Sequence, residues 1–425
     1  MLNRTVPPAF QSIKDITIIQ PEEIVYKNGL KAFVFQAESL DLLKFEVTFA
    51  NIYTQEELAY LNPILSSMLK EGTQTLSSKE IADTIDFYGA YLMPEYSLDH
   101  TSLTLYTMHK YADKVLPIVA DILRNASLPQ KELSTYIRNN KQSLQISLQK
   151  NDVLARRYFY DAVFRGTRYG VLPTEEKYDA VTREQLLNLF QHQIYPSNCT
   201  LFIAGRVDKP ILDLVSQYFG EDWKNEQKEL NANALSFDAH TTEVVVVEKP
   251  EALQSAIRLG TTSIRRAHED FPALQFVNTL FGGFFGSRLM RNIREEKGYT
   301  YSIGSYVGNL KYTGFFTIAT EVGIASTQDT LKEIATEFDR LRSEPPQQEE
   351  VDLVRNYMQG VMLGSLESIF SHVDKFKATY FSGLTLDYYR YYSDVLKAMT
   401  PAKVQDIAIK YFDYDKLYKV VVGKM

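Results

Sequence analysis

The sequence predicts an α+β protein built from two tandem homologous domains, each a mixed or antiparallel β-sheet covered by helices. Strand and helix signals follow one another without strict alternation, which favours α+β layers over a doubly wound parallel sheet. The chain has 425 residues, and single hydrophobic cores rarely grow beyond about 250 residues. A segment near the midpoint also recurs at the end of the chain, so the two domains are expected to be copies of one unit.

The recurring segment is the clearest sign of duplication. Residues 181–205 and 399–423 align without a gap over 25 positions, at an offset of 218 residues. Each has at its second position a threonine typical of a helix start, continues as an amphipathic helix and a polar turn, and ends as a strand with a final glycine. Residues 57–68 and 272–283 are a second pair of similar apolar helices. This period is too long for a solenoid and indicates duplication of a whole domain.

A polar stretch close to the midpoint of the chain separates the two copies. Residues 221–243 lack the apolar spacing of the segments on either side, which is typical of a linker. We therefore predict a first domain over residues 1–222, a linker over residues 223–242 and a second domain over residues 243–425.

Local patterns predict the elements within each half. Asn28-Gly29, between two strand-type segments, predicts a β-hairpin over residues 24–35. Apolar periodicity predicts the rest of the first half: strands over 43–49 and 102–108, helices over 56–70, 78–88 and 111–125, and a helical region over 130–164. The second half repeats this order, with strands over 243–247, 255–261 and 314–320 and helices over 271–294, 326–343 and 348–370.

Composition excludes several classes of protein. The formal net charge is −7, whereas a nucleic-acid binder normally carries a basic excess. No run approaches the 18 apolar residues of a membrane span, and two prolines interrupt the first twenty residues, so we expect a cytoplasmic protein without a signal peptide. The single cysteine, Cys199, is expected in the core. The tyrosine-rich stretches 388–392 and 411–414 are interpreted as helix faces packed on a sheet rather than walls of a peptide site.

Known metal and phosphate motifs are missing from the sequence. No two of the six histidines have the helical spacing of a zinc pair, and neither a GxSxG elbow nor a phosphate loop occurs. The glycine-bearing stretch 281–288 follows a helix rather than a strand, so its backbone N–H groups are not aimed at a phosphate. We interpret it as a break in a helix that lets another segment pack closely.

The stretch after this break places two hydrogen-bond donors near each other. Gly298 is typical of the left-handed cap that ends a helix, and Tyr299 is expected to open a strand. The reversal at the cap would let Arg294 and Tyr301 converge on one point. A guanidinium and a phenol suit a peptide carbonyl or a developing oxyanion. The alternative is a solvated helix end, with Arg294 paired to a glutamate and Tyr301 in the sheet.

Residues 281–302, FGGFFGSRLMRNIREEKGYTYS, resemble the second-domain signature of the insulinase/pitrilysin-type (inverzincin) metallopeptidases. The resemblance covers nearly the whole chain and is greatest to the small members that pair two chains, such as processing peptidases. It implies a duplicated metallopeptidase-like α/β roll. It also implies that Arg294 and Tyr301 contact the substrate backbone at the scissile bond.

The family's zinc motif is degenerate in this chain. Residues 61–73, LNPILSSMLKEGT, are similar to the first-domain signature, whose helix carries HxxEH, but Pro63 and Ser67 stand at the histidine positions and Ser66 at the glutamate position. The distal glutamate ligand would fall in residues 142–145, which hold no carboxylate. The resemblance therefore implies no metal in this chain and no hydrolysis by this chain alone. Pro94 lies in the stretch that receives substrate by strand pairing in active members, and it has no N–H to donate.

By this resemblance, the chain is expected to be the non-zinc subunit of a heterodimeric zinc metalloendopeptidase. A homologous partner chain would carry the zinc, and peptides or unfolded proteins would be the substrates. Alone, the chain could form a homodimer. The alternative is an inert peptide-binding or scaffold pseudoenzyme, like the core subunits of respiratory complexes that resemble processing peptidases. A self-sufficient peptidase is disfavoured because the scattered histidines supply no replacement motif.

Overall fold

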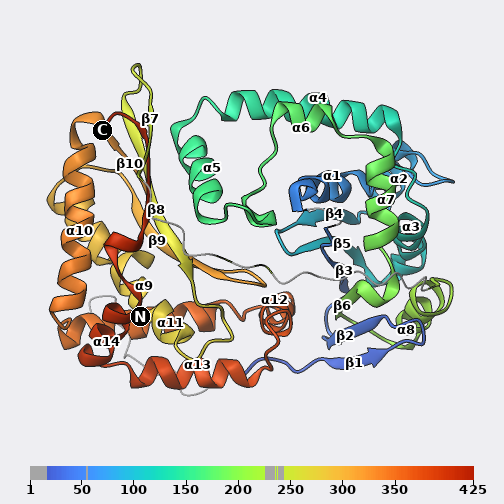
Figure 1. Cartoon of the computed structure of the whole chain (residues 1–425). Helices are drawn as coiled ribbons and strands as arrows, with labels where there is room; N and C mark the ends of the chain where they lie inside the picture. The colour runs from blue at the N-terminus through green and yellow to red at the C-terminus, as the bar shows by residue number, and fades with distance from the viewer. Residues whose placement is uncertain (1–16, 54–55, 225–234, 236, 238–243) are drawn as a thin grey trace, which may run out of the picture.

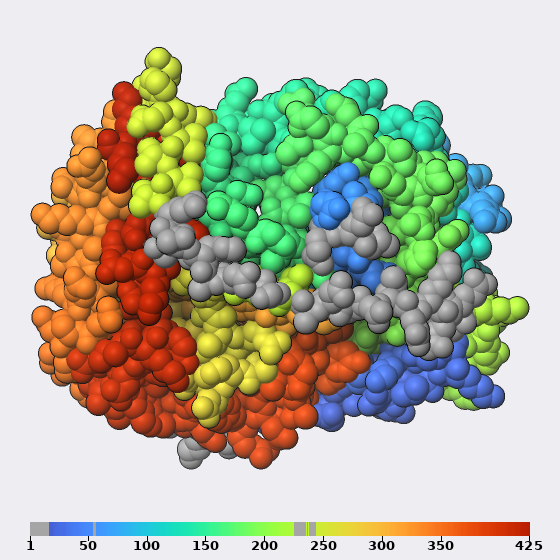
Figure 2. Space-filling model, viewed as in Figure 1, coloured from blue at the N-terminus to red at the C-terminus, as the bar shows by residue number. Residues whose placement is uncertain are grey.

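The predicted α+β architecture with two sheets is confirmed in a computed structural model of the chain (Figure 1). The structure describes residues 17–53, 56–224, 235, 237 and 244–425. The first half of the chain forms one mixed sheet and the second half forms the other. The two halves lie against each other, and in Figure 2 the orange surface of the second half meets the blue surface of the first.

The first sheet has six strands among the described residues, in the order β1-β2-β6-β3-β5-β4. Their bounds are β1 Glu22–Val25, β2 Lys31–Gln36, β3 Leu42–Ala50, β4 Tyr91–Tyr96, β5 His100–Met108 and β6 Cys199–Gly205. The predicted hairpin is confirmed, because β1 pairs with β2 in antiparallel fashion and Gly29 has φ 89° in the turn. Strand β2 runs parallel to β6, and the other pairs are antiparallel.

Helices of the first half bury their apolar faces on one side of this sheet. The helices with this role are α1 Leu61–Met68, α2 Ser78–Phe87, α3 Ala112–Asn125, α4 Gln130–Ser147, α6 Glu175–Asp179, α7 Arg183–Gln193 and α8 Lys209–Val215. In α3, Val115, Val119 and Ile122 lie at helical spacing and are fully buried. Ser77 and Glu80 form a capping box that fixes the start of α2.

The second sheet repeats the connectivity of the first, in the order β7-β11-β8-β10-β9. Its strands are β7 Val244–Glu248, β8 Gln254–Ser263, β9 Ile303–Asn309, β10 Gly314–Gly323 and β11 Tyr418–Gly423. The parallel pair β7 and β11 corresponds to β2 and β6. The recurring segments form matching units, and their final glycines, Gly205 and Gly423, adopt φ 126° and 141°. This correspondence supports the predicted duplication, with β1 as an addition to the first copy.

Two predicted helices of the second half are interrupted. The helices of this half are α9 Phe271–Asn278, α10 Thr327–Ser343, α11 Gln348–Gly364, α12 Ile369–Tyr380, α13 Asp387–Ala398 and α14 Pro401–Tyr411. The helix predicted over 271–294 ends after a π-helical turn, Thr279–Gly283, and a second π-helical segment covers Met290–Glu296. A Cβ atom at Gly282 would lie 2.5 Å from the Ser305 hydroxyl on β9, so the glycine permits the close packing expected of this break. The helix predicted over 348–370 is divided between α11 and α12.

Each half also supplies a helix that covers the sheet of the other half. Helix α5, Asn151–Val163, belongs to the first half but places Phe159 against Val420 and Val422 of β11. Helix α12 belongs to the second half but places Phe376 against Phe33 of β2, with ring centroids 4.7 Å apart. Both faces of each sheet are therefore covered, one by helices of its own half and the other by an exchanged helix (Figure 1).

The segment between the two halves is described only in part. Most of the predicted linker over 223–242 lies outside the described residues, so the domain boundaries stay a prediction. Trp223 is buried against Phe49, and Phe237 stacks on Tyr169. Cys199 is buried in β6, as expected. None of the described helices combines the length and apolar character needed to cross a membrane, and the cytoplasmic location stays a prediction.

Candidate functional site

Arg294 and Tyr301 flank a tight reversal of the chain. Arg294 lies in the π-helical segment Met290–Glu296, and such segments are frequent at functional sites. Gly298 ends this segment with φ 66°, as its capping pattern predicts. The N–H of Tyr299 then donates to the Ile293 carbonyl at 3.0 Å. Strand β9 begins at Ile303 rather than at Tyr299, so Tyr301 lies in the connection before the strand.

The reversal brings the two predicted side chains together. The Cζ atom of Arg294 lies 5.0 Å from the ring centroid of Tyr301 and 4.6 Å from that of Phe285. The guanidinium therefore contacts two aromatic rings, an arrangement that holds the charge in place while its edge stays available for hydrogen bonds. Within the described part of the chain, Arg294 has no carboxylate at ion-pair distance, so the glutamate partner of the alternative interpretation is not found there.

Phe285 is a part of this site that the sequence analysis did not identify. Its side chain is 63% exposed, and that of Tyr301 is 85% exposed. The neighbouring Phe284 contacts Tyr357 of α11, with ring centroids 4.8 Å apart. The sequence offered one sign of an exposed ring: two phenylalanines stand together inside a glycine-bearing break, where no helix face is expected to bury them. The guanidinium thus lies against two exposed rings, those of Phe285 and Tyr301, whereas Phe284 is partly buried against the core of the second half.

The degenerate zinc positions lie on α1, and their hydroxyl groups are bound to carbonyl groups. Ser66 is 2% exposed, and its Oγ donates to the Glu95 carbonyl of β4 at 3.0 Å. The Oγ of Ser67 donates to the carbonyl of Pro63 at 3.1 Å, within the same helix. Neutral hydroxyls and a proline cannot supply the imidazole and carboxylate donors that zinc requires. These residues do not fit a zinc ion, and no group of three or more His, Cys, Asp or Glu side chains suited to a metal occurs among the described residues.

The region expected for the distal ligand gives the same result. Gln142 and Gln145 lie on the exposed side of α4, and the Gln145 amide donates to the Glu175 carboxylate at 2.8 Å. Pro94 lies in β4, which is an edge strand, opposite Leu103 of β5. The proline removes one backbone donor from this strand, because its nitrogen carries no hydrogen. Arg294 and Tyr301 belong to the other half, and among the described residues no hydrogen bond, ion pair or ring contact joins them to α1 or β4.

A cavity of about 600 Å³ is lined by residues of both halves, and an adjoining cavity of about 660 Å³ is lined by residues of the second half. Arg294 and Tyr301 line neither of them. Tyr388, Tyr389 and Tyr392 of α13 line the larger cavity, which corrects the interpretation of this cluster as a face packed on a sheet. Helix α13 lies beside α11 and α9 rather than on a sheet, so its tyrosines face the space between helices. Burial raises the pKa of Tyr389 to about 12.

The other tyrosine-rich stretch agrees only in part with the prediction of a face packed on a sheet, because Phe412 contacts Phe316 of β10 but the two tyrosines contact helices. Tyr411 donates its hydroxyl to the Asp270 carboxylate at 2.6 Å, at the start of α9. Tyr414 packs against Phe338 of α10, with ring centroids 5.7 Å apart. These contacts hold α10, α9 and the C-terminal segment together, and the stretch therefore belongs to the core packing of the second half.

Comparisons with known proteins match most of the chain to peptidase family M16. Residues 57–172 match the family model described as Insulinase (Peptidase family M16), and residues 180–358 match the model of the Peptidase M16 inactive domain. The uncharacterized zinc protease YmxG of Bacillus subtilis is 23% identical over 75% of this chain and 77% of its own length. The probable inactive metalloprotease YmfF of the same organism is 25% identical over 45% of this chain and 44% of its own length. A crystal structure of a peptidase M16 inactive domain from Pseudomonas fluorescens has a TM-score of 0.83, with 20% identity over 96% of this chain and 98% of that one.

Proposed function

Because this chain belongs to the insulinase family (peptidase family M16), we propose that it is the non-zinc subunit of a heterodimeric zinc metalloendopeptidase. In this proposal the chain is inactive alone. A homologous partner chain contributes the zinc centre, and this chain contributes Arg294 and Tyr301 as donors to the carbonyl of the scissile peptide bond.

The observation that carries the proposal is the state of Arg294. Its guanidinium is held by Phe285 and Tyr301, and no carboxylate among the described residues occupies its N–H donors. A fixed fork of donors beside an exposed phenol can bind a peptide carbonyl and stabilise the negative charge that develops on its oxygen. Donors that are already in place need little rearrangement when the substrate arrives.

The state of α1 supports the division of labour between two chains. Pro63, Ser66 and Ser67 do not fit zinc, so the metal and the group that activates water have to come from another chain. The names of two relatives, a zinc protease and a probable inactive metalloprotease, suggest that the family contains both kinds of chain. The combination of retained carbonyl donors and missing metal ligands is what a non-zinc subunit requires.

A mixing experiment tests this function. The chain is purified alone and together with a zinc-bearing homologue from the same source, and cleavage of an internally quenched peptide is followed. We expect no cleavage by either chain alone and chelator-sensitive cleavage by the mixture. Chelator-sensitive cleavage by this chain alone would contradict the proposal, as would an Arg294→Ala mixture that cleaves as fast as the native mixture.

A second candidate function is a peptide-binding pseudoenzyme without any catalytic role. Pro94 favours it, because the edge strand β4 lacks one of the backbone donors needed to add a substrate strand. Calorimetric titration of the isolated chain with unfolded peptides, followed by the mixing experiment, separates the two. Peptide binding that no zinc-bearing homologue converts into cleavage would favour this second function.

A further inference from the structure

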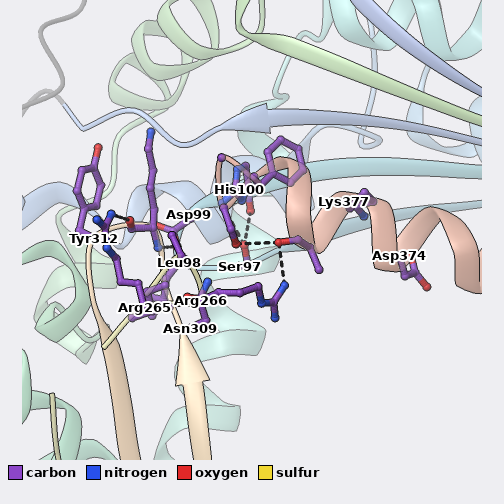
Figure 3. A pocket seen from close by; sticks show the side chains of 17 residues that line it. Ser97, Leu98, Asp99, His100, Arg265, Arg266, Asn309, Tyr312, Asp374 and Lys377 are labelled. Carbon is purple, nitrogen blue, oxygen red and sulfur yellow. Dashed lines mark hydrogen bonds between the residues drawn. The ribbon is translucent and has the colours of Figure 1, made fainter. Parts of the chain in front are cut away.

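The cavity of about 600 Å³ lies where four segments from both halves meet (Figure 3). Residues 97–100 comprise the turn between β4 and β5 in the first half and the first residue of β5. Residues 265–267 follow β8, residues 309–312 comprise the end of β9 and the turn before β10, and residues 374–383 come from α12 and the turn after it. The cavity thus has walls from the two turns that correspond to each other in the duplicated fold. Its volume is typical of a site for a small ligand or a short peptide segment.

The walls of this cavity are basic although the chain as a whole carries a net charge of −7. Four cationic side chains and two carboxylates line it: Arg265, Arg266, Lys311, Lys377, Asp99 and Asp374. Of the four cations, Lys377 is already paired with the buried carboxylate of Glu46. Both carboxylates are already engaged. Asp99 accepts hydrogen bonds from the Tyr169 hydroxyl at 2.5 Å and the Lys311 N–H at 2.8 Å, and Asp374 pairs with Lys44 at 3.3 Å.

The two guanidinium groups keep most of their donors. Arg265 donates to the Lys311 carbonyl at 3.0 Å, and Arg266 donates to the Ala378 carbonyl at 2.8 Å. A guanidinium has five N–H donors, and in the described part of the chain neither arginine is paired with a carboxylate. The Lys311 ammonium lies 5.3 Å from the Tyr312 ring, likewise without a carboxylate partner among the described residues.

Two titratable groups in and beside the cavity have a pKa that is lowered first by burial and then by neighbouring cations. Burial, together with the charges of Lys311 and Lys377, lowers the pKa of His100 to about 4. Burial and the charge of Arg266 lower the pKa of Lys375, which lines the adjoining cavity. Burial is the larger cause and disfavours any charge in the cavity, and it also raises the pKa of the Asp99 carboxyl. Only the smaller contributions of the neighbouring cations would stabilise an anion there.

We propose that this cavity binds a carboxylate of a peptide, with Arg265, Arg266 and Lys311 as its donors. The fork of a guanidinium matches the two oxygens of a carboxylate, which favours this anion over a single halide. The assignment of the carboxylate to a peptide rests on the proposed function. The assignment of an anion to the cavity rests only on the charges of the cavity itself. The carboxylate can come from an acidic side chain or from the C-terminus of the peptide.

Calorimetric titration of the isolated full-length chain tests the site without a partner and without cleavage. Three peptides of one sequence are compared: one with glutamates and a free C-terminus, one with glutamines in their place, and one with glutamates and an amidated C-terminus. We expect the first to bind, and at least one of the others to bind about tenfold more weakly. Weaker binding of the glutamine peptide would mean that the site binds an acidic side chain. Weaker binding of the amidated peptide would mean that it binds the C-terminal carboxylate. Equal binding of all three, or no binding, overturns the proposal.

Variants then locate the binding. Arg265→Gln/Lys311→Gln removes two exposed cations from the wall, and Ala267→Glu adds a negative charge at an exposed position without removing any side-chain contact. We expect each to weaken binding of the first peptide about tenfold. The matched control is Lys209→Gln/Lys416→Gln, which removes two exposed cations elsewhere and should bind as the native chain does.

The outcomes separate this site from the proposed function. If both wall variants bind the peptide like the control variant, the carboxylate site is overturned. Cleavage by the mixture that still depends on Arg294 would then leave the proposed function intact. Conversely, charge-dependent binding by the isolated chain, with no cleavage by any mixture, supports the carboxylate site and contradicts the catalytic role of the subunit.

Discussion

Lys377 of α12 donates to Glu46 of β3, so the second half places a cation on a fully buried carboxylate of the first sheet. Lys44 binds the other oxygen of Glu46 at 3.0 Å and also contacts Asp374 of α12. Burial alone would raise the pKa of Glu46, but the charges of Lys377 and Lys44 outweigh it and lower this pKa. The exchanged helix is therefore fixed to the first sheet by charge as well as by the aromatic contacts of Phe376.

Removing the carboxylate of Glu46 should destabilise the protein strongly. In Glu46→Gln, the ammonium groups of Lys44 and Lys377 lose their shared partner beneath α12, and breaking a buried pair on one side costs about 3 kcal/mol or more. Urea unfolding measures the difference in the free energy of unfolding. The control is Asp213→Asn, whose exposed pair with Lys209 should contribute less than about 1 kcal/mol. Equal stability of the two variants would contradict a stabilising role for the buried pair.

His100 should make the stability of the fold depend on pH below neutrality. The folded state lowers the pKa of His100 from 6.5 to about 4, so the unfolded chain binds more protons in this interval. Stability is then fully present above about pH 6.5 and falls as the pH decreases towards 4. We expect the loss between pH 7 and pH 4.5 to be smaller in His100→Gln than in the native chain, as measured by urea unfolding at both pH values. Parallel losses in the two proteins would rule out this contribution.

Cleavage by the mixture should require the planar guanidinium group of Arg294, and not only its positive charge. Arg294→Lys keeps a cation but loses the planar donors that lie beside Phe285 and Tyr301. We expect kcat of the mixture with the zinc-bearing partner to fall about a hundredfold, the scale seen when one preorganised donor to an oxyanion is removed. Arg291→Lys, an exposed change in the same π-helical segment, is the matched control and should keep kcat within about twofold. A lysine variant as active as this control would show that only charge matters.

Zinc should not bind to α1. The purified chain, incubated with excess zinc and desalted, is expected to contain far less than one zinc per chain by elemental analysis, and chelation should leave its melting temperature unchanged. The reason is that Pro63, Ser66 and Ser67 offer no imidazole or carboxylate. The zinc-bearing partner, treated in the same way, is the positive control. Stoichiometric zinc that disappears in Ser66→Ala would refute this assignment.

Local patterns were sufficient for the duplication and for most individual elements, but not for the interruptions of the helices predicted over 271–294 and 348–370. Asn28-Gly29 determines a turn within a few residues, and the capping and turn residues of the recurring segments act equally locally. The donors Arg294 and Tyr301 could be placed together because only a glycine cap lies between them. Phe159 and Phe376 show what local patterns could not predict. Each lies on the apolar face of an amphipathic helix, but the spacing of apolar residues does not indicate which sheet that face covers. Phe285 escaped notice because a surface made of rings from separate segments has no period in the sequence.

The exchange of α5 and α12 predicts that neither half folds well alone. Without α12, a fragment of residues 1–224 would expose the faces of Phe33, Phe35 and Phe202. Without α5, a fragment of residues 235–425 would expose Val420 and Val422. Exposed apolar patches of this kind promote aggregation.

Each fragment should therefore aggregate or bind a hydrophobic dye when expressed alone, whereas coexpressed fragments should copurify as a complex that elutes like the intact chain. Phe159→Ala in the intact chain weakens the packing of α5 without removing the helix. We expect it to lower the free energy of unfolding, measured with urea, by about 3 to 5 kcal/mol. Two fragments that unfold cooperatively on their own, combined with a small effect of Phe159→Ala, would mean that the exchanged helices add little. The two sheets would then be independent domains joined by a tether, as the linker in the sequence alone suggests.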